Sequence, residues 1–299
     1  MKFLKGFALF ILGSLLFLSL SIFGIAFMLN QTVLNPHFIT SEVNKLDINS
    51  LAEDILEDTL GQQAPSEEGE LAAKALRGTI ADLEPWLKEQ TAGAVNAFYD
   101  YLEGRDQSLS LKVSLEPVKD ALRENMREIF LQSPPAELAG LTPAELEQAF
   151  NAQWPQFSQG IPSTYELDEG SIPPDVITTL GQARQYVSYF NLGYMAMIGF
   201  ILLLILLIIL VHRNVRGSSR GLGINFLVCG VFGFASFWVA KHMAGPLLLK
   251  ADIPTYLQTW LPQLLSDTLT PLQMYSIGLM AVGVVLIIVS VAYKPRPTF

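Results

Sequence analysis

Four long apolar blocks alternate with polar sequence, at residues 7–29, 190–211, 222–244 and 273–293. From residue 198 to residue 211, every position except Gly199 is Ile, Leu, Phe or Val. About 20 consecutive apolar residues are enough to cross the roughly 30 Å hydrocarbon core of a bilayer as a helix. A buried helix of a soluble protein does not need a run this long and this apolar. The pattern therefore predicts four transmembrane helices.

The first apolar block follows Lys2 and Lys5, an arrangement that signal peptides and uncleaved anchors share. The apolar region of a signal peptide usually has about 7 to 15 residues, and residues 7–29 form a longer one. Gly24-Ile25-Ala26 is a small-x-small sequence that would suit cleavage. We expect an uncleaved anchor, and the topology of the remaining chain is the same in both cases.

The charges flanking the blocks are separated by sign, because all 28 acidic residues lie on one side of the predicted spans. An excess of Lys and Arg marks the cytoplasmic side of a membrane protein. We therefore expect a protein of the cell membrane with cytoplasmic termini, a cytoplasmic loop at residues 212–221 and an extracytoplasmic domain at residues 30–189. The basic residues that set this topology are Lys2, Lys5, Arg213, Arg216, Arg220, Lys294 and Arg296.

Residues 30–189 hold 26 acidic and 10 basic residues, a formal charge of −16. A surface of this sign repels nucleic acid and anionic head groups, which excludes nucleic acid as a partner. The one cysteine, Cys229, lies in a predicted span, so the chain cannot form an intrachain disulfide. The outer domain must therefore rest on its own hydrophobic core.

The outer domain has a mainly helical pattern. Leucine and isoleucine form an apolar stripe over residues 51–60, and residues 71–83 and 86–102 predict two more helices. Gly104 suits the left-handed residue that follows a helix. Residues 117–131 predict another helix, and Thr142 and Glu145 have the spacing of a capping box that begins the next. Residues 61–69, 133–141 and 156–162 are expected to be loops.

One segment of the outer domain changes period. Over residues 107–116, Leu109, Leu111, Val113 and Leu115 alternate with polar residues, which predicts a half-buried strand. A lone strand leaves backbone groups unpaired, and residues 163–167 are the expected partner. The predicted fold class is thus an all-α membrane protein of four transmembrane helices, with a mainly α-helical extracytoplasmic domain and a minor β element.

Apolar residues at three- and four-residue spacing run from Val176 to Phe190, and no Pro or Gly falls between Arg184 and Leu192. Because proline suits the first turn of a helix, one helix is expected to begin after Pro173-Pro174 and to continue into the second span. Such a connection can hold a domain in place or transmit its displacement.

The order YLEGRD followed by SLSLKVSLEPVKDAL resembles a pattern in bacterial four-span membrane proteins that are themselves uncharacterised and carry a large extracytoplasmic domain. The resemblance covers residues 101–122 and the four-span layout. It implies the class of protein and carries over neither an activity nor site residues.

The segment 252–270 before the last span is amphipathic, with Ile253, Leu257, Trp260, Leu261, Leu264 and Leu265 on one helical face. Tyr256 and Trp260 suit the head-group level of a membrane. Two arrangements stay open for this segment: it lies along the outer leaflet, which we favour, or it packs beneath the acidic domain.

Catalytic chemistry finds little support, because the sequence holds no HExxH, GxSxG, P-loop or GxGxxG motif. The outer domain has a single histidine, His37, between Pro36 and Phe38, where a structural role is expected. No catalytic residue and no cofactor is therefore assigned.

The most suggestive acidic cluster lies within residues 53–58, on about one and a half turns of a predicted helix. Like charges four residues apart repel each other unless a cation bridges them, and calcium prefers a loop that supplies six to eight oxygens. A solvated face is the favoured interpretation, and a cation site is the alternative. The candidate metal ligands are Glu53, Asp54, Glu57 and Asp58.

Within the spans, the third block carries small residues at helical spacing, which allow helices to approach closely in lipid. The predicted packing face is Cys229, Gly233, Ser236, Ala240 and Ala244, against the chain's own helices or another copy. Ionisable residues at bilayer depth often mark ion pathways, but Lys241 and His242 lie near the predicted outer surface. A proton-coupled pump is therefore disfavoured.

Two function classes follow. The first is a non-enzymatic extracytoplasmic binding or interaction module, anchored by a four-helix bundle, whose partners are the bilayer and an extracytoplasmic or membrane protein. The alternative is a small-molecule or lipid transporter, or a membrane-embedded enzyme, that acts between the spans with the help of Asn191 and Asn225. The sequence favours the first class and leaves the oligomeric state open.

Overall fold

The computed structural model describes residues 2–47, 50, 67–135, 138, 140–248 and 255–292. In this part of the chain there are eight α-helices, one 3-10 helix and one two-stranded sheet, which confirms the prediction of a mainly α-helical fold. The chain divides into two compact units. The apolar unit comprises Met1–Ile39 and Gln185–Phe299, and the polar unit comprises Thr40–Arg184.

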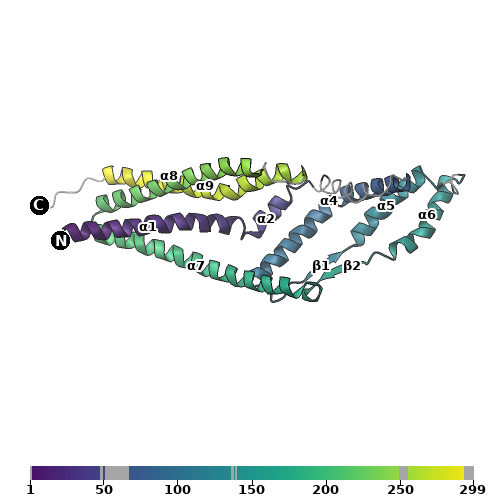
Figure 1. Ribbon diagram of the computed structural model, residues 1–299, viewed down its shortest axis with the longest axis horizontal. Coiled ribbons are helices and arrows are strands. Elements are labelled where there is room, and N and C mark those ends of the chain that lie inside the picture. The colour runs from purple at the N-terminus through teal and green to yellow at the C-terminus, as the bar shows by residue number, and fades with distance from the viewer. Residues whose placement is uncertain are drawn as a thin grey trace. The chain divides into compact units, whose positions relative to one another are not determined.

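The apolar unit is built from the long helices α1 (Lys2–Gln31), α7 (Pro174–His212, from residue 185 onward), α8 (Val215–Leu248) and α9 (Thr255–Ala292) (Figure 1). All four are long and apolar enough to cross a membrane. Helix α8 packs along α9, and α1 lies against both. A buried core joins three of the four helices through Leu16, Leu20, Ile201, Leu204, Ile208, Leu222, Phe226 and Cys229.

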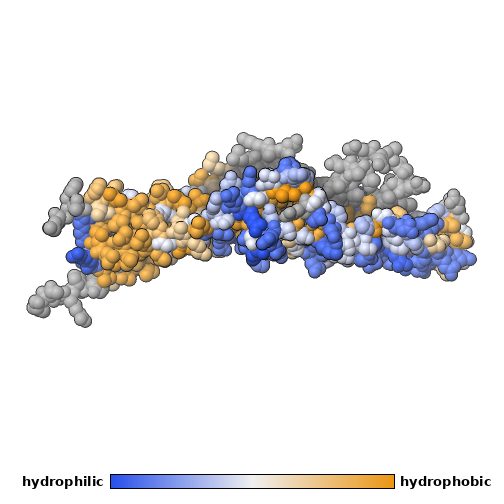
Figure 2. Space-filling view, turned by 90° about the horizontal axis from the view of Figure 1, so that it is seen from below, coloured by the Kyte–Doolittle hydropathy of each residue, from blue (hydrophilic) through white to orange (hydrophobic). Residues whose placement is uncertain are grey.

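On the face that Figure 2 shows, the apolar unit is mostly hydrophobic. Phe10 and Leu192 are each 71% exposed, and Val291 is 73% exposed. Monomeric soluble proteins rarely expose apolar patches beyond a few hundred Å². This surface is therefore suited to lipid rather than to water.

Helix α7 is one uninterrupted helix from Pro174 to His212, which confirms the prediction for this connection. It ends at Arg213, whose φ of 56° is left-handed. Asn214 then begins α8, because its side-chain oxygen accepts the backbone N–H of Gly217 at 2.6 Å. A side chain that accepts a hydrogen bond at this position replaces a partner that the first helical turn lacks.

Helix α9 joins the predicted amphipathic segment at residues 252–270 to the last predicted span, so the expected boundary between them is wrong. The described part of that segment, from Thr255 onward, continues into the last span as a single helix that contains Pro262 and Pro271. Each proline removes one backbone hydrogen bond, which made residue 271 a natural place to end a helix. The helix nevertheless continues through both prolines to Ala292.

The polar unit contains α4 (Glu67–Leu102), α5 (Glu116–Gln132), α6 (Pro143–Ser158), the 3-10 helix η2 (Glu169–Ser171) and the start of α7. The short helix α2 (Pro36–Val43) spans the boundary between the units and was not predicted. Helix α5 packs against α4 and α6 packs against α5. Ala75, Leu83, Tyr99, Tyr101, Leu102, Leu146 and Phe150 are buried in this unit.

The strands β1 (Leu111–Ser114) and β2 (Thr164–Leu167) pair antiparallel, with Leu111 opposite Leu167 and Ser114 opposite Thr164. This confirms both the predicted strand and its predicted partner, although β1 is shorter than residues 107–116. Lys112 and Glu166 stand opposite each other and form an ion pair. Opposite charges across a strand pair stabilise its register.

Helix α4 corrects the prediction of two helices at residues 71–83 and 86–102. It is one helix that begins at Glu67, inside the expected loop 61–69, and continues through Pro85. Proline has no N–H to donate, but the loss of this one hydrogen bond does not interrupt a helix that packs against α5. The predicted end is confirmed, since Gly104 has a φ of 79° and its amide donates to the Tyr101 carbonyl.

Candidate functional site

The acidic cluster Glu53, Asp54, Glu57 and Asp58 lies outside the described residues. Among the residues that the structure describes, no three His, Cys, Asp or Glu side chains are grouped so that they could hold a metal ion. Several carboxylates are instead paired with a cation. Glu84 bonds to Lys88 and Glu42 to Lys45, each at 2.6 Å.

His37 is exposed at the start of α2. Its backbone N–H donates to the side-chain oxygen of Asn35 at 3.0 Å, so this segment serves to begin the helix. A side-chain oxygen that accepts from an early backbone N–H is the ordinary way to begin a helix. The geometry is that of a structural residue.

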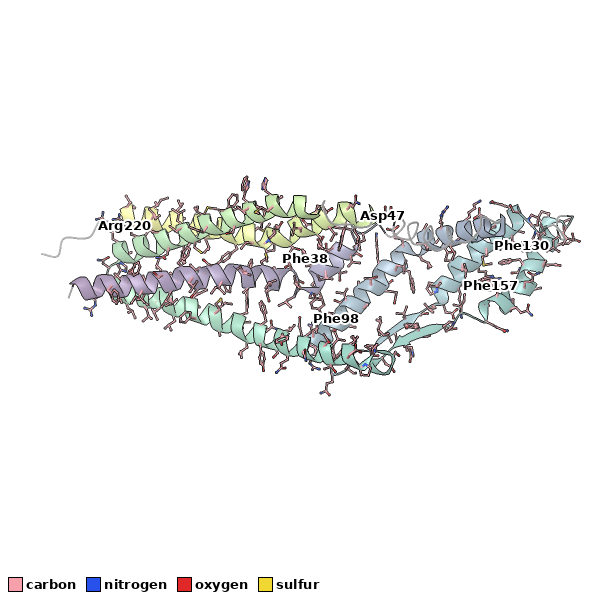
Figure 3. The ribbon with its side chains drawn as sticks, in the orientation of Figure 1. Phe38, Asp47, Phe98, Phe130, Phe157 and Arg220 are labelled. Carbon is pink, nitrogen blue, oxygen red and sulfur yellow. The ribbon has the colours of Figure 1, made fainter. Side chains whose placement is uncertain are left out.

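Four aromatic rings on α5 and α6 form a continuous series of contacts in the polar unit. The rings of Phe130 and Phe150 have centroids 5.7 Å apart, those of Phe150 and Trp154 5.9 Å, and those of Trp154 and Phe157 5.7 Å. We call Phe130, Phe150, Trp154 and Phe157 the aromatic ladder. Phe130 lies on α5 and Phe157 on the neighbouring α6 (Figure 3).

The aromatic ladder leads from the core to the surface. Phe150 is only 6% exposed, Trp154 is half-buried and Phe157 is 51% exposed. Single exposed apolar side chains are common on proteins. Phe157 differs from them because its ring ends a continuous series of contacting rings that includes the buried Phe150.

Polar contacts hold α6 on α5 beside the ladder. Arg123 donates to the side-chain oxygen of Asn151 at 2.8 Å, and Arg127 lies 3.5 Å from Glu147. The predicted capping box is confirmed, since both the amide and the hydroxyl of Thr142 donate to Glu145 at 2.8 Å. The rings are therefore carried by a helix that is fixed at its start and along its side.

Several carboxyl groups of the polar unit are held in the ionised form. Hydrogen bonds from the amide and the hydroxyl of Thr142 lower the pKa of Glu145. The side chain of Ser163, and then that of Lys119, lowers the pKa of Glu116. Ser171 does the same for the pKa of Asp168 through its hydroxyl and its amide. The unit therefore carries its negative charge at neutral pH and somewhat below.

In the apolar unit, the four predicted topology residues whose side chains are described lie at one end. The start of α1 and the turn between α7 and α8 lie together there (Figure 1), and hydrophilic residues cover that end in Figure 2. Lys5, Arg213, Arg216 and Arg220 are exposed, and the Lys5 ammonium donates to the His212 carbonyl at 3.3 Å. Among the described residues, none of these four cations pairs with a carboxylate. The side chain of Lys2 is not among those described. Lys294 and Arg296 lie outside the described residues.

The predicted packing face of α8 points in several directions. Cys229 is buried, and its sulfur lies 3.6 Å from the Ser21 hydroxyl of α1. A Cβ added to Gly233 would lie 2.4 Å from the side-chain hydroxyl oxygen of Ser276 on α9. Ser236 is exposed and donates to the Phe232 carbonyl of its own helix, Ala240 is half-buried, and the side chain of Ala244 is not described.

The closest approach of α8 and α9 uses glycines that the sequence analysis missed. A Cβ on Gly223 would lie 2.9 Å from the Gly283 carbonyl oxygen, and one on Gly230 would lie 2.7 Å from the Ser276 carbonyl oxygen. Gly223 and Gly230 are seven residues apart, so they return to the same helix face after two turns. That spacing was the available signal.

The polar residues named within the spans have local partners or face outward. His242 bonds to the Trp238 carbonyl at 2.8 Å, and the Lys241 ammonium lies 5.9 Å from the Phe237 ring centroid. Asn191 is exposed. The side-chain amide of Asn225 donates to the Gly221 carbonyl at 3.0 Å and lies against Gly13 of α1.

Asn225 lines a groove between α1 and α8, which we call the α1–α8 groove. Its volume is about 440 Å³, within the range of small-ligand sites, roughly 300 to 1,000 Å³. The lining is apolar apart from Asn225 and Ser14, and one side is open to the surroundings of the helices. The groove is lined by Leu9, Phe10, Gly13, Ser14, Phe17, Ile224, Asn225 and Val228.

Comparison with known proteins finds no matching family model, no matching curated protein and no matching solved structure.

Proposed function

We propose that the protein is a multi-pass protein of the cell membrane whose polar unit is an extracytoplasmic, non-enzymatic binding module for another protein. The four apolar helices anchor that module in the bilayer. The observation that carries the proposal is the aromatic ladder, which brings a core-anchored stack of rings to the surface at Phe157. Binding rather than catalysis is proposed because the sequence holds none of the common catalytic motifs.

Aromatic residues are well suited to this role. Tyrosine and tryptophan are enriched at the residues that dominate protein–protein binding energy, and such residues lie in well-packed surroundings. A ring that is already fixed in its free state loses little side-chain entropy on binding. The acidic residues of the polar unit favour a partner with a basic surface, because charge complementarity steers association.

The proposed orientation rests on the charges of the apolar unit. Lys5, Arg213, Arg216 and Arg220 mark one end of the bundle, and basic residues favour the cytoplasmic side. The polar unit, with 26 acidic residues, would then lie outside the cell. In this orientation both termini are cytoplasmic.

Crosslinking tests the binding proposal directly. A photoreactive phenylalanine analogue replaces Phe157 in the full-length protein in native membranes, and the same analogue replaces Tyr165, which is similarly exposed at 53%. We expect a discrete protein adduct from position 157 and none from position 165. Equal adducts at both positions, or none at either, contradict the proposed surface.

Labelling tests the orientation. In a Cys229→Ser background, a membrane-impermeant maleimide is added to intact cells that carry Gln107→Cys or Arg213→Cys, both at exposed positions. We expect label on the first variant alone, and label on both after the cells are opened. Label on Arg213→Cys in intact cells overturns the orientation.

The second candidate is a transporter or enzyme for a small molecule or lipid that acts between the spans, and the α1–α8 groove favours it. The two candidates differ in what accompanies the purified protein. A stoichiometric protein crosslinked at Phe157 supports the binding module. Turnover or transport of a bound small molecule that stops when the groove is filled supports the second candidate.

A further inference from the structure

We propose that the α1–α8 groove binds one anionic phospholipid, with an acyl chain along the groove and the phosphate between Lys5 and Arg220. The site rests on the proposed insertion of the four apolar helices in a bilayer, and a resident lipid suits a binding module and a transporter alike.

Contacts along α1 and α8 fix how the two helices align. Gly13 lies against the side chain of Asn225, Phe17 packs edge-on against Phe232 with centroids 5.9 Å apart, and Ser21 reaches Cys229. The earliest of the three α1 residues, Gly13, meets the earliest of the three α8 residues, Asn225, and both later α1 residues meet later residues of α8. Helices α1 and α8 therefore run in the same direction, and their starts lie at the same end of the groove.

This alignment places the cations at the mouth of the groove. Residues four apart share one face of a helix, so Lys5 precedes the lining residue Leu9 by one turn, and Arg220 precedes the lining residue Ile224 in the same way. One turn of an α-helix corresponds to about 5.4 Å. A head group at these two cations is thus within one turn of an acyl chain in the groove.

The two cations have bonding capacity to offer. The described residues supply no carboxylate partner for either, and the Lys5 ammonium uses one of its three donors on the His212 carbonyl. A phosphate accepts several hydrogen bonds at once and pairs well with guanidinium. Basic pockets between transmembrane helices bind anionic head groups for this reason.

The polar lining residue fits the same ligand. Asn225 follows Arg220 by five residues, which is about 7.5 Å further along the helix axis. That distance below the phosphate corresponds to the ester region of a phospholipid, whose carbonyl oxygens accept hydrogen bonds from an amide. The walls beyond it are the apolar side chains Phe10, Phe17 and Val228.

A transmembrane helix of another protein is the competing occupant. It would fill the apolar part of the groove, but it would have to bring a carboxylate to the level of Lys5 and Arg220 to satisfy them. An anionic phospholipid supplies both the chain and the charge in one molecule, and for this reason we assign the site to it.

Native mass spectrometry of the full-length protein in detergent tests the assignment. Phosphatidylglycerol and phosphatidylcholine with identical chains are added in equal amounts. We expect one tightly retained phosphatidylglycerol, and the double variant Lys5→Gln/Arg220→Gln should reduce its preference over phosphatidylcholine at least about tenfold, because each basic residue near the head groups contributes roughly a factor of five. Lys241→Gln, on the same helix but outside the groove, is the matched control and should leave the preference unchanged.

A second pair of variants tests the position of the acyl chain. Val228→Trp fills the groove, whereas Val231→Trp adds the same side chain at an exposed position of α8 outside the groove lining. We expect Val228→Trp to lose the bound phosphatidylglycerol and Val231→Trp to retain it. The proposal is overturned if the unaltered protein retains both lipids equally, or if neither Lys5→Gln/Arg220→Gln nor Val228→Trp changes the lipid that is retained. It is also overturned if a protein occupies the groove in place of the lipid.

Discussion

A Cβ added to Gly24 of α1 would lie 2.8 Å from Cε1 of Tyr275 of α9, so the tyrosine ring occupies the space that a side chain at residue 24 would need. The Tyr275 hydroxyl also donates to the Leu20 carbonyl of α1 at 2.9 Å. Rings from Phe23 and Phe27 lie 5.9 Å and 5.8 Å from the Tyr275 ring. The ring is therefore held on several sides and links α1 to α9.

Gly24→Leu is expected to lower the free energy of unfolding by about 1 to 3 kcal/mol, because the added side chain must displace a ring that is held in place. The measurement is the thermal unfolding midpoint of the full-length protein in detergent. Gly278→Leu is the matched control on the same helix as Tyr275, since nothing lies within 4 Å of its added Cβ. A Gly24→Leu variant as stable as the control would show that α1 is not packed here as described.

Gly230→Leu should separate α8 from α9, because its Cβ would lie 2.7 Å from a backbone carbonyl oxygen that cannot rotate away. Small residues at such crossings allow the backbones to approach in lipid. We expect a loss of about 1 to 3 kcal/mol and weaker crosslinking between cysteines introduced on α8 and α9. Gly199→Leu on α7 meets nothing within 4 Å and should have little effect. Intact α8–α9 crosslinking in Gly230→Leu would contradict the close approach.

Within the polar unit, Gly78→Ala should be destabilising and Gly93→Ala stabilising, although both lie on α4. The new Cβ at residue 78 would lie 2.1 Å from Oδ1 of Asn125, which must turn away and lose its 2.7 Å bond to Asp82. Residue 93 meets nothing within 4 Å. The expected changes are a loss of about 1 kcal/mol for the first and a gain of about 0.5 to 1 kcal/mol for the second, since alanine is the better helix former. Limited proteolysis, which reports unfolding of the polar unit, measures whether each variant is less or more stable than the unaltered protein. Increased stability of both variants would contradict the close contact between residue 78 and Asn125.

The start of α6 should weaken in acid. The amide and hydroxyl of Thr142 lower the pKa of Glu145 in the folded protein. The stabilisation that this cap provides is therefore complete above the pKa of glutamate in the unfolded chain, about 4.3, and is lost as the pH falls through the lower folded value. Hydrogen-exchange protection of the first turn of α6, followed between about pH 6 and pH 3, measures it. Glu145→Gln keeps an acceptor but does not ionise over this range, so it should remove the pH dependence; an unchanged dependence would assign it to another carboxyl group.

The parts of the fold that local sequence specifies were predictable. The spans follow from uninterrupted apolar runs, the pairing of β1 with β2 from one alternating segment, and the start of α6 from Thr142 and Glu145. Proline caused the main errors. The expected helix boundaries near Pro85 and Pro271 are wrong, because the helices continue through both prolines and pack against α5 and α8, respectively.

The candidate site was harder to predict because it arises from packing between helices. Residues 156–162 were expected to be a loop after Pro155, but α6 continues to Ser158, and this extra turn carries Phe157. Phe150, Trp154 and Phe157 lie on one helical face, a pattern that also suits an ordinary core. The contact with Phe130 of α5 and the exposure of Phe157 show that the rings form one series that joins the two helices and reaches the surface.

The small sheet brings together the two ends of the segment that contains α5 and α6, the helices that carry the aromatic ladder. The backbone amide of Leu115 donates to the Ser163 carbonyl at 2.8 Å. Helices α5 and α6 lie between these two residues in the sequence, so the segment that holds them begins and ends beside the same sheet. Segments whose ends are neighbours can be exchanged or inserted with little disturbance to the host. A segment of different length or sequence could therefore follow α5 between these strands, provided that α5 keeps its packing against α4 and β1 stays paired with β2.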